Sequence, residues 1–378
     1  MKRLLITSRC SWTIYNFRRG IVKKAINKGY KVYCASLKDE YTSKLLDLGV
    51  EFTALPLSKR GLNIFEELSL LFSFIKLIQS IKPDIIHNFT IKPVIYSSIA
   101  TLFFKKPKVV NSITGLGYVF SEESSAWLKI FIIFLYKIVL GRSYKVFFQN
   151  EDDLNTFLKH KIIKREKAIL VPGSGVDLEH FSKKVIHTNE KELESKKVKF
   201  VMVSRLIKSK GVYEYVNAAK ILKKKKNNVS FTLVGGLDDG NDDSIDEKLF
   251  DKWKKESLID IIGEVEDVRL YLANSDVLVL PTRYKEGIPK SIIEAGAMGL
   301  CVITTNIPGN REVIKDRVNG LLIEPKRLSS EELAKHMLIL VNDRVLLNKL
   351  KKSARNIIRK RFDEKFVIDK IFDVYEHA

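Results

Sequence analysis

The strongest constraint on this chain is a repeated alternation of short apolar segments with longer segments of helical periodicity. The apolar segments are three to six residues long and rich in β-branched and aromatic residues, so we expect strands there. Short apolar strands between helices are typical of a parallel sheet covered on both faces. In the first half the expected strands are Arg3–Thr7, Lys31–Ala35, Val50–Leu55, Asp84–His87, Val109–Ile113 and Lys145–Phe148, and the expected helices include about Asn16–Lys28, Tyr41–Leu48 and Ile64–Ile81. In the second half the expected strands are Lys199–Val203, Ser230–Val234, Asp260–Ile262, Val277–Leu280 and Cys301–Thr304, and the expected helices are Val212–Lys225, Glu247–Glu256, Val268–Ala273, Lys290–Met298 and the tail from Ser329.

The alternation stops once in the middle of the chain, which predicts two α/β domains. It ends near Pro172–Phe181, and the polar, weakly periodic stretch Lys183–Lys197 is expected to be the linker. The length of 378 residues agrees, since domains commonly hold roughly 100–200 residues. We therefore predict domains over residues 1–184 and 185–363. Parallel sheets bind ligands outside the carboxyl ends of their strands, so we expect the site in a cleft between the domains.

Cysteine content and hydropathy exclude several other classes. The three cysteines, Cys10, Cys34 and Cys301, lie far apart without metal-binding spacing, which argues against a disulfide framework or a cysteine zinc site. A reducing cytoplasm is therefore the expected compartment. No apolar run reaches the roughly 18–20 residues that span a bilayer, and the apolar start of the chain is too short for a signal-peptide core.

Positive charge is concentrated in the first half of the chain. Residues 1–184 carry 30 Lys and Arg against 15 Asp and Glu, a net charge of +15, whereas residues 185–378 carry 36 against 30, a net charge of +6. Such a basic half favours an anionic partner: a phospholipid surface, a nucleic acid or a phosphorylated substrate. A general bias toward lysine is the alternative for the total charge, but it does not explain the difference between the halves.

The most specific chemical pattern is the string Glu286-Gly-Ile-Pro-Lys-Ser-Ile-Ile-Glu-Ala, which comes shortly after an expected strand. Pro289 suits a first helical turn, and Gly287 permits a close approach to a ligand. The amides around Lys290 and Ser291 then form a helix N-terminus, which favours phosphate. The string predicts an anion-binding helix start at the carboxyl edge of the second sheet.

Two carboxylates and two cations accompany this helix start. Glu294, one turn into the helix, can accept two hydrogen bonds from a ribose diol, and Glu286 can bind the hydroxyls of another ring. The string Val203-Ser-Arg-Leu-Ile-Lys-Ser-Lys-Gly places Arg205 and Lys210 at the turn after the first strand of the second half. These cations can converge on a diphosphate and neutralise a leaving group. A solvated basic turn is the alternative.

This combination resembles the retaining, nucleotide-sugar-dependent glycosyltransferases with the GT-B fold, glycosyltransferase family 4 or group 1. Three further strings are similar to family motifs: a hinge, a loop beside the nucleobase and a late turn. They are Pro172-Gly-Ser-Gly-Val-Asp177…Phe181, Gly263-Glu-Val-Glu-Asp-Val268 and Asn319-Gly320-Leu-Leu. The resemblance covers essentially the whole chain. It implies an α/β GT-B architecture of two Rossmann-like parallel domains facing a central cleft, with the last helix, 364–378, packing back on the first domain.

The resemblance implies a role for each matching residue. Arg205 and Lys210 bind the donor diphosphate and assist departure of the nucleotide, while Glu286 holds hydroxyls of the donor sugar. Glu294 holds the ribose, and the backbone near Val265 contacts the base. Further donor contacts are expected from Gly235, Gly287, Ile288, Pro289, Lys290 and Ser291. No metal and no cofactor are implied, and the pairs Asp238-Asp239 and Asp242-Asp243 are expected to be surface turns.

The first half is expected to bind the acceptor, and it matches the family less closely. The segment after its first strand has no glycine before Gly20, so contacts from the family's glycine-rich loop are not expected. His87 is carried over as a catalytic residue, although Phe89 stands where many relatives have a second histidine. A satisfied core histidine is the alternative. A donor-facing loop is expected at Gly115 and Gly117, and acceptor contacts are expected from Asn16, Arg18 and Lys92.

Two strings in the first half resemble a narrower subgroup, the bacterial enzymes that extend glycans on undecaprenyl diphosphate for O-antigen, capsule or protein glycosylation. They are His87-Asn-Phe-Thr-x-Lys-Pro…Tyr96 and Ser112-Ile-Thr-Gly-Leu-Gly-Tyr-Val-Phe120. The apolar segment Trp127–Leu140 is either a helix lying on the membrane surface or a buried helix of the first domain. With Lys105-Lys106-Pro107-Lys108 and the basic first half, it favours a peripheral protein at the anionic inner leaflet.

The function expected from the sequence is transfer of a sugar from a UDP-sugar to a lipid-diphosphate-linked saccharide, with retention of the anomeric configuration. An N-acetylhexosamine such as GalNAc is one candidate sugar. Three alternatives stay open: a UDP-sugar 2-epimerase of the same fold, a pyridoxal-phosphate-dependent phosphorylase and a basic nucleic-acid-binding protein. The string from Glu286 to Glu294 argues against the epimerase, and no recognised nucleic-acid-binding motif is present, so we expect no nucleic-acid partner.

Overall fold

The computed structural model describes residues 1–57, 63–116, 125–182, 197–226, 228–238 and 240–378. The chain divides into two compact units: Met1–Ser174 together with Glu364–Ala378, and Gly175–Asp363. The expected domain boundary between residues 184 and 185 lies outside the described residues, as does nearly all of the expected linker.

Unit 1 is built on a seven-stranded sheet in which every neighbouring pair of strands is parallel. Its strands are β1 (Arg3–Cys10), β2 (Lys31–Leu37), β3 (Glu51–Ala54), β4 (Ile85–Phe89), β5 (Lys108–Ile113), β6 (Lys145–Phe148) and β7 (Ala168–Leu170). They lie in the order β3-β2-β1-β4-β5-β6-β7. Chain order reverses between β1 and β4, which is where sheets of this kind form a ligand crevice at their carboxyl edge.

Both faces of the unit 1 sheet are covered, as the apolar strands predict. Side chains alternate along β1: Leu4 and Ile6 enter one hydrophobic cluster and Leu5 enters another. None of the three has exposed surface. The covering helices are α1 (Ser11–Asn27), α2 (Thr42–Leu46), α3 (Ile64–Ile81), α4 (Ile91–Ala100), α5 (Ala126–Arg142), α6 (Glu151–Lys159) and α15 (Glu364–Glu376).

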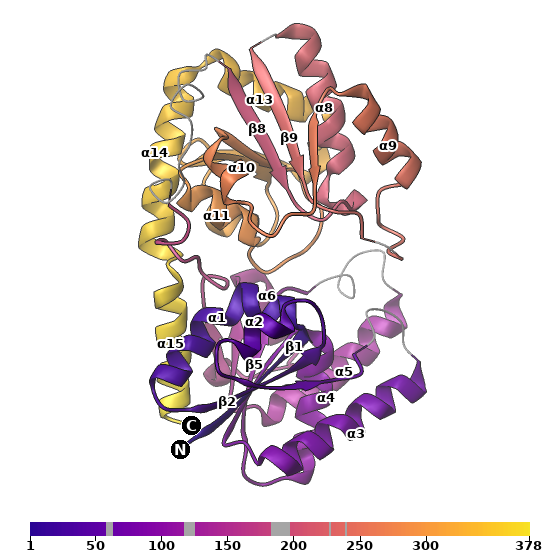
Figure 1. The fold of residues 1–378 in the computed structure, drawn as a ribbon, viewed down its shortest axis with the longest axis vertical. Helices are drawn as coiled ribbons and strands as arrows, with labels where there is room; N and C mark the ends of the chain where they lie inside the picture. Colours follow the sequence, from indigo (N-terminus) through magenta and orange to yellow (C-terminus); the bar gives the residue numbers. More distant parts are fainter. Residues whose placement is uncertain (58–62, 117–124, 183–196, 227, 239) are drawn as a thin grey trace. The chain divides into compact units, whose positions relative to one another are not determined.

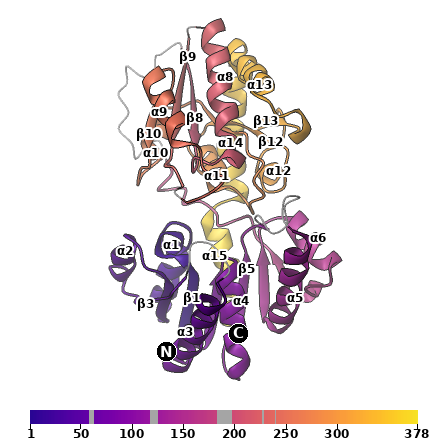
Figure 2. The same ribbon diagram turned by 90° about the vertical axis from the view of Figure 1, so that its right-hand side faces the viewer.

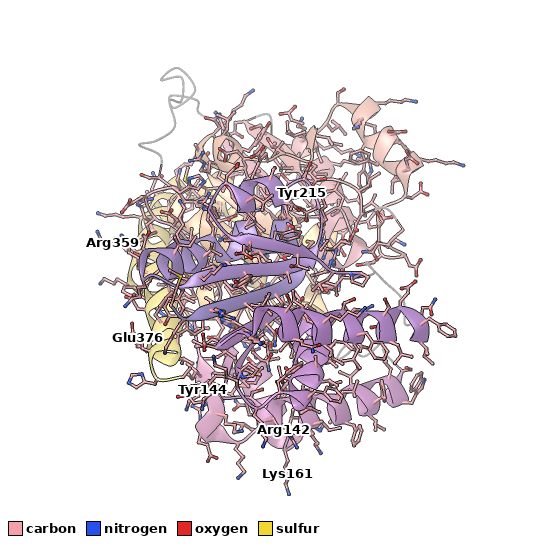
Figure 3. All side chains as sticks on the ribbon, turned by 60° about the horizontal axis from the view of Figure 1, so that its bottom comes forward. Arg142, Tyr144, Lys161, Tyr215, Arg359 and Glu376 are labelled. Carbon is pink, nitrogen blue, oxygen red and sulfur yellow. The ribbon has the colours of Figure 1, made fainter. Side chains whose placement is uncertain are left out.

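Helix α15 is the last element of the chain, yet it packs beside α1 (Figure 1). Ion pairs join the two helices on the surface: Lys24 contacts Asp369, and Lys28 lies 2.6 Å from Glu376. Glu376 is labelled at the end of α15 in Figure 3. The side chain of Tyr375 is fully buried between α15 and the sheet. The chain therefore ends inside the unit in which it began.

The sequence predicts that helix α5 either lies on the membrane surface or is buried in the first domain. The helix carries apolar side chains on both its buried and its exposed side. The buried side chains are Ile132, Tyr136, Val139 and Leu140. The exposed large apolar side chains are Trp127, Ile130, Phe131, Phe134 and Ile138. Among the described residues, no helix combines the length and the apolar character needed to cross a bilayer.

Unit 2 has a second parallel sheet, of six strands. They are β8 (Val198–Val203), β9 (Val229–Val234), β10 (Asp260–Gly263), β11 (Val277–Leu280), β12 (Cys301–Thr305) and β13 (Gly320–Ile323), in the order β10-β9-β8-β11-β12-β13. The helices are α8 (Val212–Lys225), α9 (Glu247–Glu256), α10 (Arg269–Ala273), α11 (Lys290–Ala297), α12 (Asn310–Val313), α13 (Ser330–Asn342) and α14 (Arg344–Arg361). Helices α8 and α13 pack together, as do α11 and α14 (Figure 2). Chain order reverses between β8 and β11, so the loops after these strands meet at one edge.

Three elements differ from the sequence prediction. Helix α1 begins at Ser11 rather than near Asn16, because β1 runs on to Cys10 and turns directly into the helix. The strands β7 and β13 were not predicted, since each is an edge strand of three or four residues, too short to give a clear apolar period. Strand β13 occupies the string expected to form a late turn. Position 320 favours glycine because a β-carbon there would collide with the carbonyl oxygen of Val302.

Candidate active site

The reversal point of the unit 2 sheet fixes two loops against each other. The amide of Arg283, after β11, donates to the carbonyl of Ser209, after β8, over 2.7 Å. The hydroxyl of Thr282 donates to the same carbonyl at 3.2 Å. Gly211 has a φ of +80°, and a β-carbon there would collide with the carbonyl of Pro281. The predicted cation string and the predicted carboxylate string are therefore tied together through backbone contacts.

Lys210 ends the short 3-10 helix η5 (Lys208–Lys210), and its side chain is buried. Its ammonium forms an ion pair with the carboxylate of Glu286 and lies 5.4 Å from the centre of the Tyr284 ring. Burial, followed by the nearby Arg205 cation, lowers the pKa of Lys210 to about 7. The ion pair with Glu286 opposes this effect by favouring the charged ammonium. An anion that binds at this position would contact an ammonium group that is already removed from water.

Arg205 is also paired, with a carboxylate that the sequence analysis had placed in a surface turn. Its Nη1 lies 2.6 Å from Oδ2 of Asp238, which also accepts a hydrogen bond from Asn241 at 2.9 Å. Asp243 accepts from the amide and hydroxyl of Ser209. Asp242 and Asp243 lie in a turn, as predicted, but Asp238 and Asp243 are also bound to the residues of the loop after β8. The turn residues act as counter-ion and tether for the loop after β8, because the neighbouring strand β9 brings their loop to the same edge.

The start of helix α11 lies where the sequence predicts it. Pro289 is the N-cap in an extended conformation, and Lys290 is the first helical residue. Gly287 contacts a loop that the sequence analysis missed: a β-carbon on Gly309, whose φ is +86°, would collide with the Gly287 carbonyl oxygen. The pair Pro308-Gly309 is a turn signal directly after β12, and it could have pointed to this support.

Glu294 lies one turn into α11 and is largely removed from solvent. Burial raises its pKa to about 7; the Lys290 cation opposes the rise and the Asp267 carboxylate adds to it. Asp267 follows Val265 in the loop after β10, and the half-buried Val265 packs on the unit 2 core. Gly235, with a φ of +146°, presses against the carbonyl of Ser204, where a β-carbon would collide. The predicted donor residues of unit 2 thus lie on loops that meet at one sheet edge.

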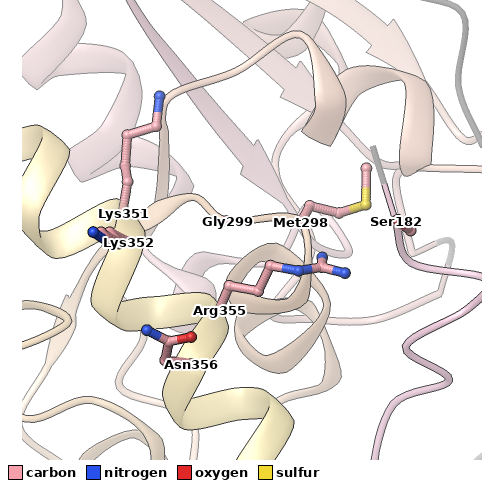
Figure 4. A pocket seen from close by; sticks show the side chains of 7 residues that line it. All are labelled: Ser182, Met298, Gly299, Lys351, Lys352, Arg355 and Asn356. Atoms are coloured by element: carbon pink, nitrogen blue, oxygen red, sulfur yellow. The ribbon is translucent and has the colours of Figure 1, made fainter. Parts of the chain in front are cut away.

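A pocket in unit 2 lies at the carboxyl end of α11, away from the predicted donor residues. This pocket has a volume of about 450 Å³ and is lined by Ser182, Met298, Gly299, Lys351, Lys352, Arg355 and Asn356 (Figure 4). Two of its cations serve the fold: Lys351 lies 2.5 Å from Asp276, and Arg355 donates to the Ala297 carbonyl. Among the described residues, no group of three or more His, Cys, Asp or Glu side chains could hold a metal ion.

In unit 1, His87 is enclosed by the core. It has no exposed surface, and its two ring nitrogens lie 2.6 Å from the Tyr375 hydroxyl and 2.8 Å from the Ser112 hydroxyl. Burial, followed by the Arg18 cation, lowers the pKa of His87 well below its usual value. A neutral imidazole with both nitrogens engaged supports the alternative of a satisfied core histidine. His87 is accordingly left out of the catalytic proposal below.

The remaining unit 1 candidates are spread over several elements. Lys92 lies 2.5 Å from Glu67 and joins α4 to α3, so its charge serves the helix interface. The side chain of Asn16 donates to the carbonyl of Trp12 at 3.1 Å. Gly115 follows β5 with a φ of +127°, and Gly117 lies outside the described residues. Arg18 is buried against Phe89.

Comparison with known proteins decides the family. The family described as "Glycosyl transferases group 1" matches residues 184–357, and "Glycosyl transferase 4-like" matches residues 4–150. The chain is similar to the UDP-Gal:alpha-D-GlcNAc-diphosphoundecaprenol alpha-1,3-galactosyltransferase of Escherichia coli. The two are 30% identical over 343 residues, which cover 87% of this chain and 84% of the relative. The chain belongs to the group 1 glycosyltransferases.

Two further matches agree with this assignment. The glycosyltransferase is 28% identical over 385 residues to the N,N'-diacetylbacillosaminyl-diphospho-undecaprenol alpha-1,3-N-acetylgalactosaminyltransferase of Campylobacter jejuni, covering 100% of this chain and 99% of the relative. Among solved structures, Anabaena Alr3699/HepE in complex with UDP-glucose matches with a TM-score of 0.81 and 16% identity, over 100% of both chains. At that identity the structural match shows the fold alone. The expected α/β GT-B class is confirmed.

The family assignment confirms that this glycosyltransferase is an enzyme of the expected class. The relatives above are named as transferases, so the epimerase alternative receives no support. The roles of individual residues stay predictions. The structure adds three candidates that the sequence analysis did not single out as functional: Asp238, Tyr284 and Gly309.

Proposed function

We propose that this glycosyltransferase moves a sugar from a UDP-sugar to a saccharide linked through a diphosphate to a lipid, with retention of the anomeric configuration. One observation carries the proposal: Arg205 and Lys210 lie at one sheet edge, and each contacts a single carboxylate, Asp238 and Glu286. A diphosphate has the charge to replace both carboxylates at once. Charge-assisted hydrogen bonds of this kind are roughly twice as strong as neutral ones.

Replacement of the two carboxylates by a diphosphate gives each predicted donor residue of unit 2 a defined role. When a diphosphate takes Lys210, the carboxylate of Glu286 is released to accept hydrogen bonds from hydroxyls of the donor sugar. Glu294 accepts hydrogen bonds from the ribose diol, and the backbone near Val265 contacts the base. The first turn of α11, from Ile288 to Ser291, adds amide contacts to phosphate, as expected for a helix N-terminus.

Catalysis in this proposal is electrostatic. The bond between the anomeric carbon and the β-phosphate oxygen breaks while the acceptor oxygen bonds to the same face of that carbon. The acceptor proton passes to the departing phosphate oxygen, so no separate base is needed. Arg205 and Lys210 stabilise the charge that develops on the leaving UDP. Lys210 does so from a buried position and Arg205 from an exposed one held by Asp238, and preorganised cations are well suited to that role.

The acceptor class rests on the two relatives, whose names place their acceptors on diphospho-undecaprenol. We extend that class to this chain. The relative matched over the full length of this chain is named as an N-acetylgalactosaminyltransferase, so UDP-GalNAc is the first donor to test.

We also propose that the enzyme meets its acceptor at the anionic inner face of the cell membrane. The exposed apolar residues of α5 have counterparts on α3: Ile64, Phe65, Leu68 and Phe72. Helices α3 and α5 both pack on α4, and exposed lysines accompany them at Lys76 and Lys137. An exposed apolar and aromatic surface with basic neighbours suits an anionic lipid interface.

The transfer is tested by nucleotide release in the presence of EDTA, with UDP-, GDP- and ADP-sugars and a short lipid-diphosphate saccharide. Acceptor-dependent release of UDP, with an α-linked product, supports the proposal. Release without any acceptor-linked product, or an inverted linkage, contradicts it.

The membrane surface is tested separately by co-sedimentation with vesicles of phosphatidylglycerol or of phosphatidylcholine. The double variant Trp127→Ser, Phe131→Ser is expected to lose most binding to the anionic vesicles. The matched control is Leu46→Ser, which removes an exposed apolar side chain from α2. Equal binding by both variants contradicts the proposed surface.

A further inference from the structure

Arg18 is a buried cation that the proposed mechanism does not use. It lies on α1 with 7% of its surface exposed, and its guanidinium carbon is 4.2 Å from the centre of the Phe89 ring. Burial lowers the pKa of Arg18 to about 10, which leaves the side chain charged at neutral pH. Its charge must therefore be accommodated inside unit 1.

The surroundings supply little compensation for that charge. Among the described residues, the hydrogen-bond partner of the guanidinium is the Phe17 carbonyl, at 3.3 Å, although the group has five N–H donors. No carboxylate of the described residues forms an ion pair with it. Its other polar neighbours, His87 and Tyr375, are occupied with each other and are neutral.

Three lysine side chains that are shielded from solvent each have a carboxylate partner, unlike Arg18. Lys210 pairs with Glu286, Lys92 pairs with Glu67, and Lys351 pairs with Asp276. Removing a charge from water without a partner is costly, so a buried cation normally has a carboxylate beside it. Among the described residues of unit 1, Arg18 is an exception to this pattern, and the exception leaves its guanidinium available for an anionic ligand.

The position of Arg18 is that of a ligand contact. Phe89 is the last residue of β4, and β4 lies beside β1 where the strand order reverses. Thr90, which follows, has a φ of +67° and a ψ of 155°, a conformation that β-branched residues rarely adopt. Strained backbone of this kind gathers at ligand sites. The guanidinium therefore lies beside the edge where a parallel sheet receives ligands.

We propose that Arg18 binds a phosphoryl oxygen of the acceptor's diphosphate. This inference rests on the proposed function, in which the acceptor is a saccharide linked to a lipid through a diphosphate. The planar fork of arginine suits two oxygens of one phosphate, and the Phe89 ring beneath it holds the plane in place. Arg18 is thus a substrate-binding residue of unit 1, with the diphosphate as the anion that completes its hydrogen bonding.

The test compares Arg18→Met with Arg19→Met, a control one residue further along α1 whose guanidinium lies over Tyr15. Each enzyme is given the same saccharide in two forms, linked to a lipid diphosphate or carried as a neutral glycoside with an apolar aglycone. If Arg18 binds the acceptor diphosphate, kcat/KM for the first form falls about 10- to 100-fold in Arg18→Met, as expected for a charged hydrogen bond. With the neutral form, kcat/KM of the Arg18→Met enzyme stays at the wild-type value. The Arg19→Met enzyme keeps the wild-type kcat/KM with both forms. A matching loss with both acceptors shows that the effect does not depend on the acceptor diphosphate and overturns the inference.

A second measurement does not depend on turnover. With the donor site saturated by UDP, inorganic pyrophosphate is expected to raise the melting temperature of the wild-type enzyme and of Arg19→Met, but not of Arg18→Met. If Arg18 only supports the fold, Arg18→Met melts lower and still responds to pyrophosphate, which overturns the inference. Arg18→Lys keeps the charge and is expected to retain part of the response. A wild-type enzyme that transfers to no diphosphate acceptor would refute the proposed function, while the pyrophosphate response would still decide the role of Arg18.

Discussion

Donor binding is predicted to have a bell-shaped pH dependence, because the pKa values of buried Lys210 and half-buried Glu294 are both shifted toward neutrality and donor binding needs the charged form of each. Burial raises the pKa of Glu294 to about 7 and lowers the pKa of Lys210 to about 7. A ribose diol donates hydrogen bonds, so it needs Glu294 ionised. A diphosphate is an anion, so it needs Lys210 protonated.

The direction and the steepness of each limb of the pH profile follow from the pKa values of Glu294 and Lys210. As the pH falls below 7, Glu294 takes up a proton, and the competent fraction drops about threefold from pH 7 to pH 6 and about tenfold for each pH unit beyond that. As the pH rises above 7, Lys210 loses its proton with the same slope. The dissociation constant of a UDP-sugar is therefore expected to be smallest near pH 7 and about threefold larger at pH 6 and pH 8.

Titration calorimetry between pH 5.5 and 8.5, without acceptor, measures this profile. The ligand should be a UDP-sugar rather than UDP, because a terminal phosphate itself titrates near pH 6. Glu294→Gln is expected to remove the acidic limb and Lys210→Met the alkaline limb, each with weaker binding at pH 7. Glu247→Gln, an exposed position at the start of α9, is the matched control and should keep both limbs.

Two results would refute the reasoning. A flat profile in the wild-type enzyme would mean that neither group titrates near neutrality in the free site. An acidic limb that persists in Glu294→Gln would show that another group controls donor binding at low pH.

Three further predictions follow from the contacts described above. Arg205→Ala is expected to reduce UDP release about 10²-fold, the size seen when a charge-stabilising donor is lost, and near-normal turnover would remove it from catalysis. Gly309→Ala is expected to lower both melting temperature and activity, because its β-carbon meets the Gly287 carbonyl. Gly49→Ala, also at positive φ but with open space around it, should lower only the melting temperature. Tyr375→Phe leaves one nitrogen of buried His87 unpaired and is expected to cost about 1–3 kcal/mol of unfolding free energy with unchanged KM values, measured by denaturation and steady-state kinetics.

Much of the fold was predictable because its signals are local. The run Leu4-Leu5-Ile6 is continuously apolar since both faces of its strand are covered, and the start of α11 is encoded by Pro289 within a few residues. Edge strands such as β7 were missed because they are short and bury little. The start of α1 was misplaced because the turn after β1 uses no glycine or other loop signal.

For the candidate site too, the sequence predicted the local features and the structure was needed for the distant ones. Sequence spacing by itself determined which residues of unit 2 carry the chemistry: two cations after β8, and two carboxylates flanking the start of α11. Spacing cannot show which charges are paired, because the partner of Arg205 is 33 residues away and the partner of Lys210 is 76 residues away. Those pairs form when parallel strands bring the ends of separate loops to one edge.

Burial is the other property that the tertiary structure alone decided. From the sequence, His87 was predicted to be catalytic or a core histidine and Arg18 to contact the acceptor, and both prove to be buried near the end of β4. Histidine satisfies both of its nitrogens there, whereas arginine keeps a charge that no carboxylate of the described chain balances. The sequence determined the α/β architecture and the kinds of chemistry available, because periodicity and motif spacing are local. The tertiary structure decided which charges are buried and which are paired, because desolvation and pairing depend on neighbours that are distant in the chain.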